Sequence, residues 1–217
     1  MFKKYWKFFV IFWSVVLVGI IGVFVFFWLI SAGKLGFMPT FEELENPNNR
    51  FASEVYFADG PIMNRYFEKE NRKYIEYREI PQSVIDALIA TEDVRFYDHS
   101  GVDVRGLFRV AKGLLTANTS AGGGSTISQQ LAKMLFPRES DLNVFELAIR
   151  KFREWVIAVR LEKSYTKEEI LTMYLNKYDF LNLAVGISSA ADIYFQVPLD
   201  SLKVEQAAML IGMAKNS

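Results

Sequence analysis

The sequence contains no cysteine and only one histidine, His99. The lack of cysteine excludes disulfides and thiolate-bound metal sites, although it leaves the redox compartment open. A single histidine cannot form a metal centre that is built from several imidazole ligands. The composition therefore excludes the common zinc sites that depend on cysteine or on groups of histidines.

Acidic side chains are missing from residues 1–34, where the charged residues are Lys3, Lys4, Lys7 and Lys34. The whole chain has 25 basic and 25 acidic residues, so the part beyond residue 34 carries more acidic than basic side chains. Nucleic-acid binding needs a basic face. We therefore expect no nucleic-acid partner.

Charge of either sign is absent from residues 8–30, in which Ser14, Gly19 and Gly22 are the main interruptions of an apolar run. A helix of this length crosses a hydrocarbon core of about 30 Å. The apolar part of a cleaved signal peptide is shorter, about 7–15 residues. The sequence thus predicts a transmembrane helix at 8–30 after a basic tip at 1–7.

The lysines around this span predict its orientation. Lys3, Lys4 and Lys7 precede the span, and only Lys34 follows it closely. The positive-inside rule then places the N-terminus in the cytoplasm and the rest of the chain outside. We expect a single-pass membrane protein with an extracytoplasmic domain.

Residues 31–50 are rich in glycine, proline and asparagine and are typical of a linker. Two short β-prone runs then flank Asp59-Gly60, which indicates a hairpin. The pattern becomes helical beyond Pro81. We predict one mainly α domain at 51–217, and we expect it to be truncated at its C-terminus because the chain stops within a helical pattern.

The first chemical cluster is ATEDVRFYDHSG, residues 90–101. It follows a predicted helix in which Ser83 and Asp86 fit a capping box. Glu92 shares the apolar face of this helix with Leu88 and Phe96. Partial burial disfavours the charged form of a carboxylate, which suits a general base or acid near neutral pH. The alternative is a helix-end carboxylate paired with Arg95 or Arg105, and position alone favours it.

The second cluster is GGGSTISQQLAKMLF, residues 122–136. Its glycines lead into Ser125, which we predict as the N-cap of a helix. Free backbone N–H groups at such a helix start suit a phosphate, and Gln129, Gln130 and Lys133 add polar side chains. The alternative is a flexible loop before an ordinary helix.

The third cluster lies in the predicted helix VFELAIRKFREWVIAVRLEK. One face carries Arg150, Lys151 and Glu154, which suits an anionic leaving group such as a diphosphate. The alternative is a solvated face with intrahelical ion pairs. A second face carries apolar residues, and we predict that it packs into the core: Phe145, Ala148, Phe152, Trp155 and Val159.

Five ordered motifs across roughly residues 40–217 resemble glycosyltransferase family 51, the peptidoglycan glycosyltransferase domain of class A penicillin-binding proteins and monofunctional transglycosylases. They are EDVRFYDHSG (matching at Glu92, Asp93, Phe96, His99 and Gly101), GGSTISQQLAK (Gly123–Lys133), RKFRE (Arg150–Glu154), EEILTMYLN (Glu168–Asn176) and ISSAADIYF. Some positions depart from the family pattern: Met134, Thr172, Gln196-Val197, and the segment KYDFLNLAVG, which lacks glycines that are common there.

The resemblance implies a lysozyme-like fold and polymerisation of lipid II into β-1,4 glycan strands, with inversion and release of undecaprenyl diphosphate. It implies two catalytic residues: Glu92 as the general base, and Glu154 near the diphosphate, which it would hold directly, through basic residues or through Mg²⁺ or Mn²⁺. No metal is required with certainty. The motifs also place these residues at the substrate: Asp93, Phe96, His99, Gly123, Gly124, Ser125, Thr126, Gln129, Gln130, Lys133, Arg150 and Lys151.

The same resemblance implies lipid II and the growing lipid-linked glycan as partners, together with the membrane and other proteins of cell-wall synthesis and division. Two other functions stay open. A lysozyme-like peptidoglycan hydrolase would use paired carboxylates, but it leaves the basic helix and the glycine loop unexplained. A non-catalytic scaffold would bind lipid II without turning it over.

Overall fold

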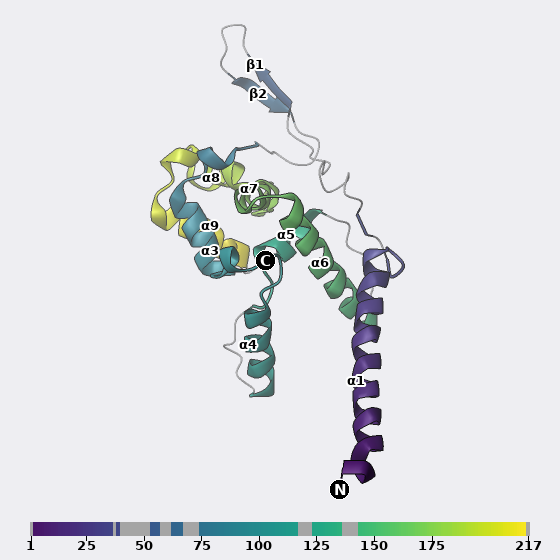
Figure 1. Cartoon of the computed structure of the whole chain (residues 1–217). Coiled ribbons are helices and arrows are strands. Elements are labelled where there is room, and N and C mark those ends of the chain that lie inside the picture. The colour runs from purple at the N-terminus through teal and green to yellow at the C-terminus, as the bar shows by residue number, and fades with distance from the viewer. Residues whose placement is uncertain are drawn as a thin grey trace.

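A computed structural model describes residues 2–36, 38–39, 53–56, 62–66, 74–116, 123–135 and 143–215. The mainly helical fold predicted from the sequence is confirmed (Figure 1). The α-helices are α1 (Phe2–Ser31), α3 (Gln82–Glu92), α4 (Val104–Leu115), α5 (Ile127–Leu135), α6 (Val144–Ser164), α7 (Lys167–Lys177), α8 (Ile187–Phe195) and α9 (Val204–Lys215). Three short 3₁₀ helices, η1 (Tyr77–Glu79), η2 (Phe96–Asp98) and η4 (Leu199–Ser201), connect some of them.

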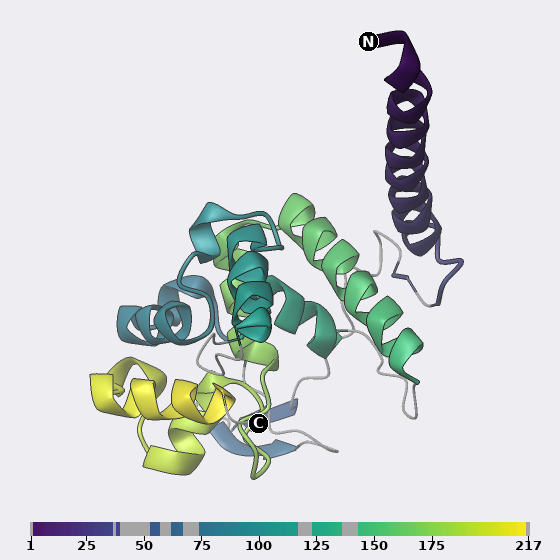
Figure 2. The same ribbon diagram turned by 90° about the horizontal axis from the view of Figure 1, so that it is seen from below.

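The N-terminal helix α1 extends away from the helical body, as two perpendicular views show (Figures 1 and 2). Its segment Tyr5–Ser31 is long and apolar enough to cross a membrane. Most of its large apolar side chains are exposed, so they do not contribute to a protein core. Length, composition and exposure together agree with the transmembrane helix predicted at 8–30.

The last turns of α1 pack against α6. Phe26 and Phe27 both meet the ring of Phe152 edge to face, at centroid distances of 5.4 and 5.7 Å. Arg160 donates hydrogen bonds of 2.8 Å to the carbonyl and hydroxyl oxygens of Ser31. A cation is favourable there because the C-terminal end of a helix carries partial negative charge. The anchor helix is thus attached to α6.

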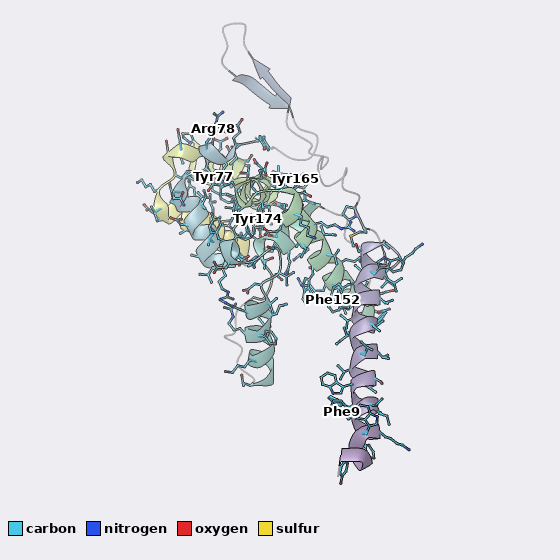
Figure 3. All side chains as sticks on the ribbon, in the orientation of Figure 1. Phe9, Tyr77, Arg78, Phe152, Tyr165 and Tyr174 are labelled. Carbon is cyan, nitrogen blue, oxygen red and sulfur yellow. The ribbon has the colours of Figure 1, made fainter. Side chains whose placement is uncertain are left out.

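The predicted core stripe of α6 is therefore wrong. Phe145 is 70% exposed, and Phe152 contacts α1 (Figure 3). The face that enters the core carries Ile149, Ile157, Ala158 and Leu161 instead. Helix α6 is apolar on two sides because it contacts the body on one side and α1 on another, and helical periodicity alone does not say which side is which.

The hydrophobic core lies among the helices of the C-terminal body. Helix α5 contacts both α6 and α7, and α3 packs against α9 (Figure 1). Fully buried side chains from α3, α5, α7 and α9 fill much of this space: Val84, Leu88, Ile127, Leu131, Ile170, Leu171, Tyr174, Leu210 and Ile211. This core fixes the positions of α3, α5 and α7 relative to one another, and these helices carry three of the motifs.

Two strands, β1 (Ser53–Tyr56) and β2 (Ile62–Tyr66), pair in antiparallel register with Glu54 opposite Arg65. The turn predicted at Asp59-Gly60 lies outside the described residues. The same is true of most of the predicted linker at 31–50, of which the structure describes 31–36 and 38–39.

The capping box predicted at Ser83 is also wrong. Helix α3 begins at Gln82 after Pro81, so Ser83 already lies within its first turn. In that turn Gln82 Nε2 donates to Asp86 Oδ1 at 2.8 Å. Capping boxes occur instead at the starts of α6 and α7, where Asn143 pairs with Glu146 and Thr166 with Glu169.

A left-handed loop joins α7 to α8. Leu181, Asn182 and Leu183 have φ angles of +69°, +49° and +66°, in the segment that lacks the family's usual glycines. For a residue with a Cβ atom, this left-handed conformation is about 1–2 kcal/mol less favourable than the right-handed one. The hydrogen bond from Phe180 N to Ala184 O, 2.9 Å long, closes the loop despite that strain.

We predict that Leu183→Gly raises the free energy of unfolding by about 0.5–1 kcal/mol, because glycine removes the clash of Cβ at positive φ. Little burial is lost, since Leu183 is 62% exposed. Denaturant unfolding of the purified protein measures the change. The matched control, Leu183→Ala, also truncates the side chain but keeps Cβ and should give no gain. Equal stability of both variants would contradict the strain argument.

Candidate active site

The start of α5 brings the first three motifs together, and Tyr174 of the fourth also reaches this helix. Gln130 Nε2 donates to Glu92 Oε2 at 2.7 Å, which connects the second motif to the first. Lys151 Nζ donates to Ser125 Oγ at 3.0 Å, which connects the third motif to the second. The two predicted catalytic segments are thus attached to opposite ends of one short segment, residues 125–130.

Glu92 is the last residue of α3, and its side chain is half-buried. Its Oε2 atom accepts from Gln130, whereas its Oε1 atom is buried and has no hydrogen-bond partner among the described residues. Arg95 pairs with Asp103, and within the described part of the chain Glu92 forms no ion pair. The alternative of a helix-end ion pair with Arg95 or Arg105 is therefore wrong. A carboxylate with one oxygen held and the other unpaired can accept a proton.

Asp93 holds the first motif to α5. The residue is only 7% exposed. Its carboxylate accepts a hydrogen bond from Ile127 N at 3.1 Å and lies 3.0 Å from His99 Nε2. A negative charge at a helix N-terminus is favourable. Phe96 is fully buried beneath Lys167 Nζ, 4.2 Å from the ring centroid. In this structure Asp93, Phe96 and His99 support the site, and their contact with substrate stays a prediction.

Helix α5 begins one residue later than a Ser125 cap would place it. Thr126 is the capping residue, because its Oγ1 accepts from Gln129 N at 3.2 Å while donating to Gly101 O at 2.7 Å. Gln129 Nε2 also donates to Gly101 O, at 3.2 Å. The buried side chains of Thr126 and Gln129 therefore hold the end of the first motif.

These contacts change the expected phosphate site at the helix start. Two of its backbone N–H groups, those of Ile127 and Gln129, already donate to Asp93 and Thr126. The loop ahead of the helix stays accessible, since Gly123 is exposed and Gly124 and Ser125 are half-buried. An anion would therefore meet this loop and nearby cationic side chains.

Lys151 lies between Ser125 and Glu154. Its Nζ atom is 2.9 Å from Glu154 Oε2, so the intrahelical ion pair considered above is present, and it also reaches across to the second motif. Glu154 is 8% exposed, Arg150 is half-buried on the same helix and Lys133 is exposed on α5. The third motif thus provides the cationic side chains Arg150 and Lys151, and Glu154 is already paired with Lys151.

Among the described ranges, no three His, Cys, Asp or Glu side chains gather in a way that could hold an ion. Glu154 would contribute a single carboxylate. A divalent ion there would therefore take most of its ligands from a bound diphosphate and from water.

A partly buried ionic network lies near the site and was not predicted from the sequence. Glu162 on α6 accepts a hydrogen bond from Ser128 Oγ and pairs with Lys167 Nζ at 2.7 Å. Lys167 also donates to His99 O at 2.7 Å. The available signal was the position of Lys167, directly before EEILTMYLN, but only the fold shows which residues it joins.

Comparison with known proteins gives the family. A family model described as Transglycosylase matches residues 59–217. The chain belongs to the transglycosylase family. This confirms the resemblance drawn from the five motifs, and the matched segment is a peptidoglycan glycosyltransferase domain. With the apolar helix α1, the family match indicates a membrane-anchored protein.

Curated relatives of this transglycosylase include penicillin-binding protein 1A of Escherichia coli (strain K12) and of Pseudomonas aeruginosa, each 37% identical over 178 residues. The protein of the same name from Neisseria lactamica is 36% identical. Each alignment covers 82% of this chain but only 20%, 21% and 22% of the respective relative. The chain thus spans about a fifth of the length of the curated relatives it matches.

We predict that Gly101→Ala destabilises the protein by about 2–4 kcal/mol. Gly101 has φ +92°, and a Cβ there would lie 2.8 Å from the carbonyl carbon and oxygen of Ala158 on α6. Gly123→Ala is the control, because nothing lies within 4 Å of its Cβ position. Thermal and denaturant unfolding should leave this control within about 0.5 kcal/mol of wild type. Equal losses in both variants would contradict the packing argument.

Proposed function

We propose that this chain polymerises lipid II, a disaccharide-pentapeptide on undecaprenyl diphosphate, into β-1,4 glycan strands. The observation that carries the proposal is the state of Glu92, whose Oε2 atom is held by Gln130 while its buried Oε1 atom has no partner among the described residues. This geometry provides a positioned proton acceptor in the first motif of a transglycosylase domain.

In the proposed step, Glu92 removes the proton from the sugar 4-hydroxyl of the acceptor. The hydroxyl oxygen attacks C1 of the lipid-linked donor, and the bond between C1 and the diphosphate oxygen breaks. The bonding electrons leave with undecaprenyl diphosphate. Direct displacement inverts C1, so an α-linked diphosphate yields a β-linked glycan.

The departing diphosphate needs positive charge, because negative charge grows on it as its bond to C1 breaks. Lys151 is the best-placed cation, since Ser125 and Glu154 hold its ammonium group at 3.0 and 2.9 Å. Arg150 and Lys133 would add charge. Glu154 would act mainly by orienting Lys151, and a Mg²⁺ or Mn²⁺ ion bound with the diphosphate would supplement these side chains.

The anchor suits a substrate with a polyprenyl tail. Both the enzyme and lipid II would stay in one bilayer, so they meet by diffusion in two dimensions. The orientation proposed from Lys3, Lys4 and Lys7 places the domain on the extracytoplasmic side of the plasma membrane. Other proteins of cell-wall synthesis and division are proposed partners on that side.

The direct test compares wild-type protein in detergent with Glu92→Gln, using lipid II and a gel that resolves glycan strands. The variant removes the proton acceptor with almost no change of shape, so we expect polymer from wild type and at least a hundredfold less from Glu92→Gln. Glu205→Gln, on the exposed first turn of α9, makes the same chemical change far along the chain and should keep wild-type activity.

The other outcomes separate the alternatives. Equal polymer from wild type and Glu92→Gln would overturn the base assignment while keeping the activity. Soluble sugar released from finished peptidoglycan would support the hydrolase. Binding of lipid II without turnover by wild type would support the scaffold and overturn the proposed reaction.

The absence of cysteine allows a simple test of orientation. We expect a membrane-impermeant maleimide to label Lys163→Cys, which is exposed on α6, in intact spheroplasts. Lys4→Cys should react only after the membrane is broken. The reverse pattern would place the domain in the cytoplasm and exclude a substrate on the outer face.

A further inference from the structure

A buried phenol lies behind the Glu92–Gln130 pair. Tyr174 on α7 is 0% exposed and is among the largest fully buried side chains of the described residues (Figure 3). Its hydroxyl group donates to Gln130 Oε1 at 3.1 Å. A phenylalanine would fill the same space without burying a polar atom, which is costly unless it is hydrogen-bonded. Packing alone therefore does not account for the hydroxyl group.

The direction of these hydrogen bonds follows from the chemistry of the three groups. Burial, followed by the nearby charge of Glu92, raises the pKa of Tyr174, so its hydroxyl group keeps its proton. Gln130 Oε1 can only accept, which leaves Gln130 Nε2 to donate to Glu92 Oε2 at 2.7 Å. A reversed amide would place its oxygen against the carboxylate. Tyr174 and Glu92 thus favour the same orientation of Gln130.

The phenol is itself held in place by its neighbours. Its ring stacks on Tyr178 at a centroid distance of 5.5 Å and an interplanar angle of 23°. Tyr178 in turn donates from its hydroxyl group to Ala214 O on α9, at 2.7 Å. The position of the Tyr174 hydroxyl group is therefore set by α7 and α9, which are outside the cluster of charged side chains.

We propose that Tyr174 is a positioning residue for the general base and acts through Gln130. It fixes the Gln130 amide, Gln130 fixes Glu92 Oε2, and Glu92 Oε1 is then left as the oxygen that takes the proton. The proposal rests on the proposed role of Glu92. Hydrogen bonds in such a chain strengthen one another, so the phenol also helps to stabilise the ionised carboxylate.

The test removes only the hydroxyl group. We expect Tyr174→Phe to lower kcat of lipid II polymerisation about tenfold, which corresponds to the free energy of about one lost hydrogen bond. KM should stay within about twofold, because the phenol is buried and does not reach the substrate. The acidic limb of the kcat profile should move to higher pH, since an ionised carboxylate that has lost support is protonated more readily.

Tyr178→Phe is the matched control. It removes an equivalent hydroxyl group from the adjacent ring, but that group bonds to Ala214 rather than to Gln130. Its kcat and its pH profile should match wild type even if its melting temperature falls. If both variants lose activity in parallel, with unshifted pH profiles, the effect is structural and the positioning role is overturned.

A double-mutant cycle adds a second criterion. Once Gln130→Met has broken the chain, adding Tyr174→Phe should change kcat less than twofold; a further tenfold loss would show that Tyr174 acts by another route. Glu92→Gln measured alongside keeps the two proposals distinguishable. If Glu92→Gln is inactive while Tyr174→Phe behaves as wild type, only the role of Tyr174 fails. If Glu92→Gln is fully active, the base assignment is wrong, and the proposed role of Tyr174 falls with it.

Discussion

The carboxylate of Asp93 attaches the N-terminus of α5 to the loop that follows α3, and the geometry of the site depends on that attachment. Ile127 N and His99 both form hydrogen bonds with this carboxylate, and Asp93 is buried. Because Asp93 directly follows Glu92, fixing α5 at Asp93 also sets the distance at which Gln130 meets Glu92. The segment 125–130 at the start of this helix can thus hold the proton acceptor Glu92 through Gln130 and contact Lys151 through Ser125.

Buried polar groups are concentrated around this helix, whereas the packing of α3 against α9 is mainly apolar. Glu162, Lys167 and Ser128 form an ionic network on one side of α5, and Tyr174 reaches Gln130 from α7. Such groups are costly to bury and are retained when their bonds specify one arrangement. Their presence at the site fits a domain in which orientation of a few side chains matters more than the largest possible stability.

Helix α6 connects the anchor helix α1 to the candidate active site. One side of this helix contacts α1 through Phe152 and Arg160, and another carries Lys151 and Glu154. The position of the proposed diphosphate site is therefore tied to the end of the helix that crosses the membrane. A lipid-linked substrate entering from the same bilayer would meet cations whose orientation relative to that helix is already set.

Much of this protein could be predicted from local patterns. The uncharged run at 8–30 requires a long apolar helix, and the spacing of apolar residues beyond Pro81 predicts helices, because both depend on neighbours within a few positions along the chain. The motif residues could likewise be identified from their order. The cap at Ser125 and the core stripe at Phe145 and Phe152 were wrong, because each depends on what a distant segment offers.

The sequence by itself determined the anchor, the helical class and the set of chemical groups. Only the tertiary structure decided that Lys151 donates to the hydroxyl group of Ser125, that α1 packs against Phe152, and that Tyr174 donates to Gln130. These contacts join residues 26, 125 and 44 positions apart. Local propensity carries no information about such pairs, because burial and hydrogen-bond partners exist only once the helices have packed.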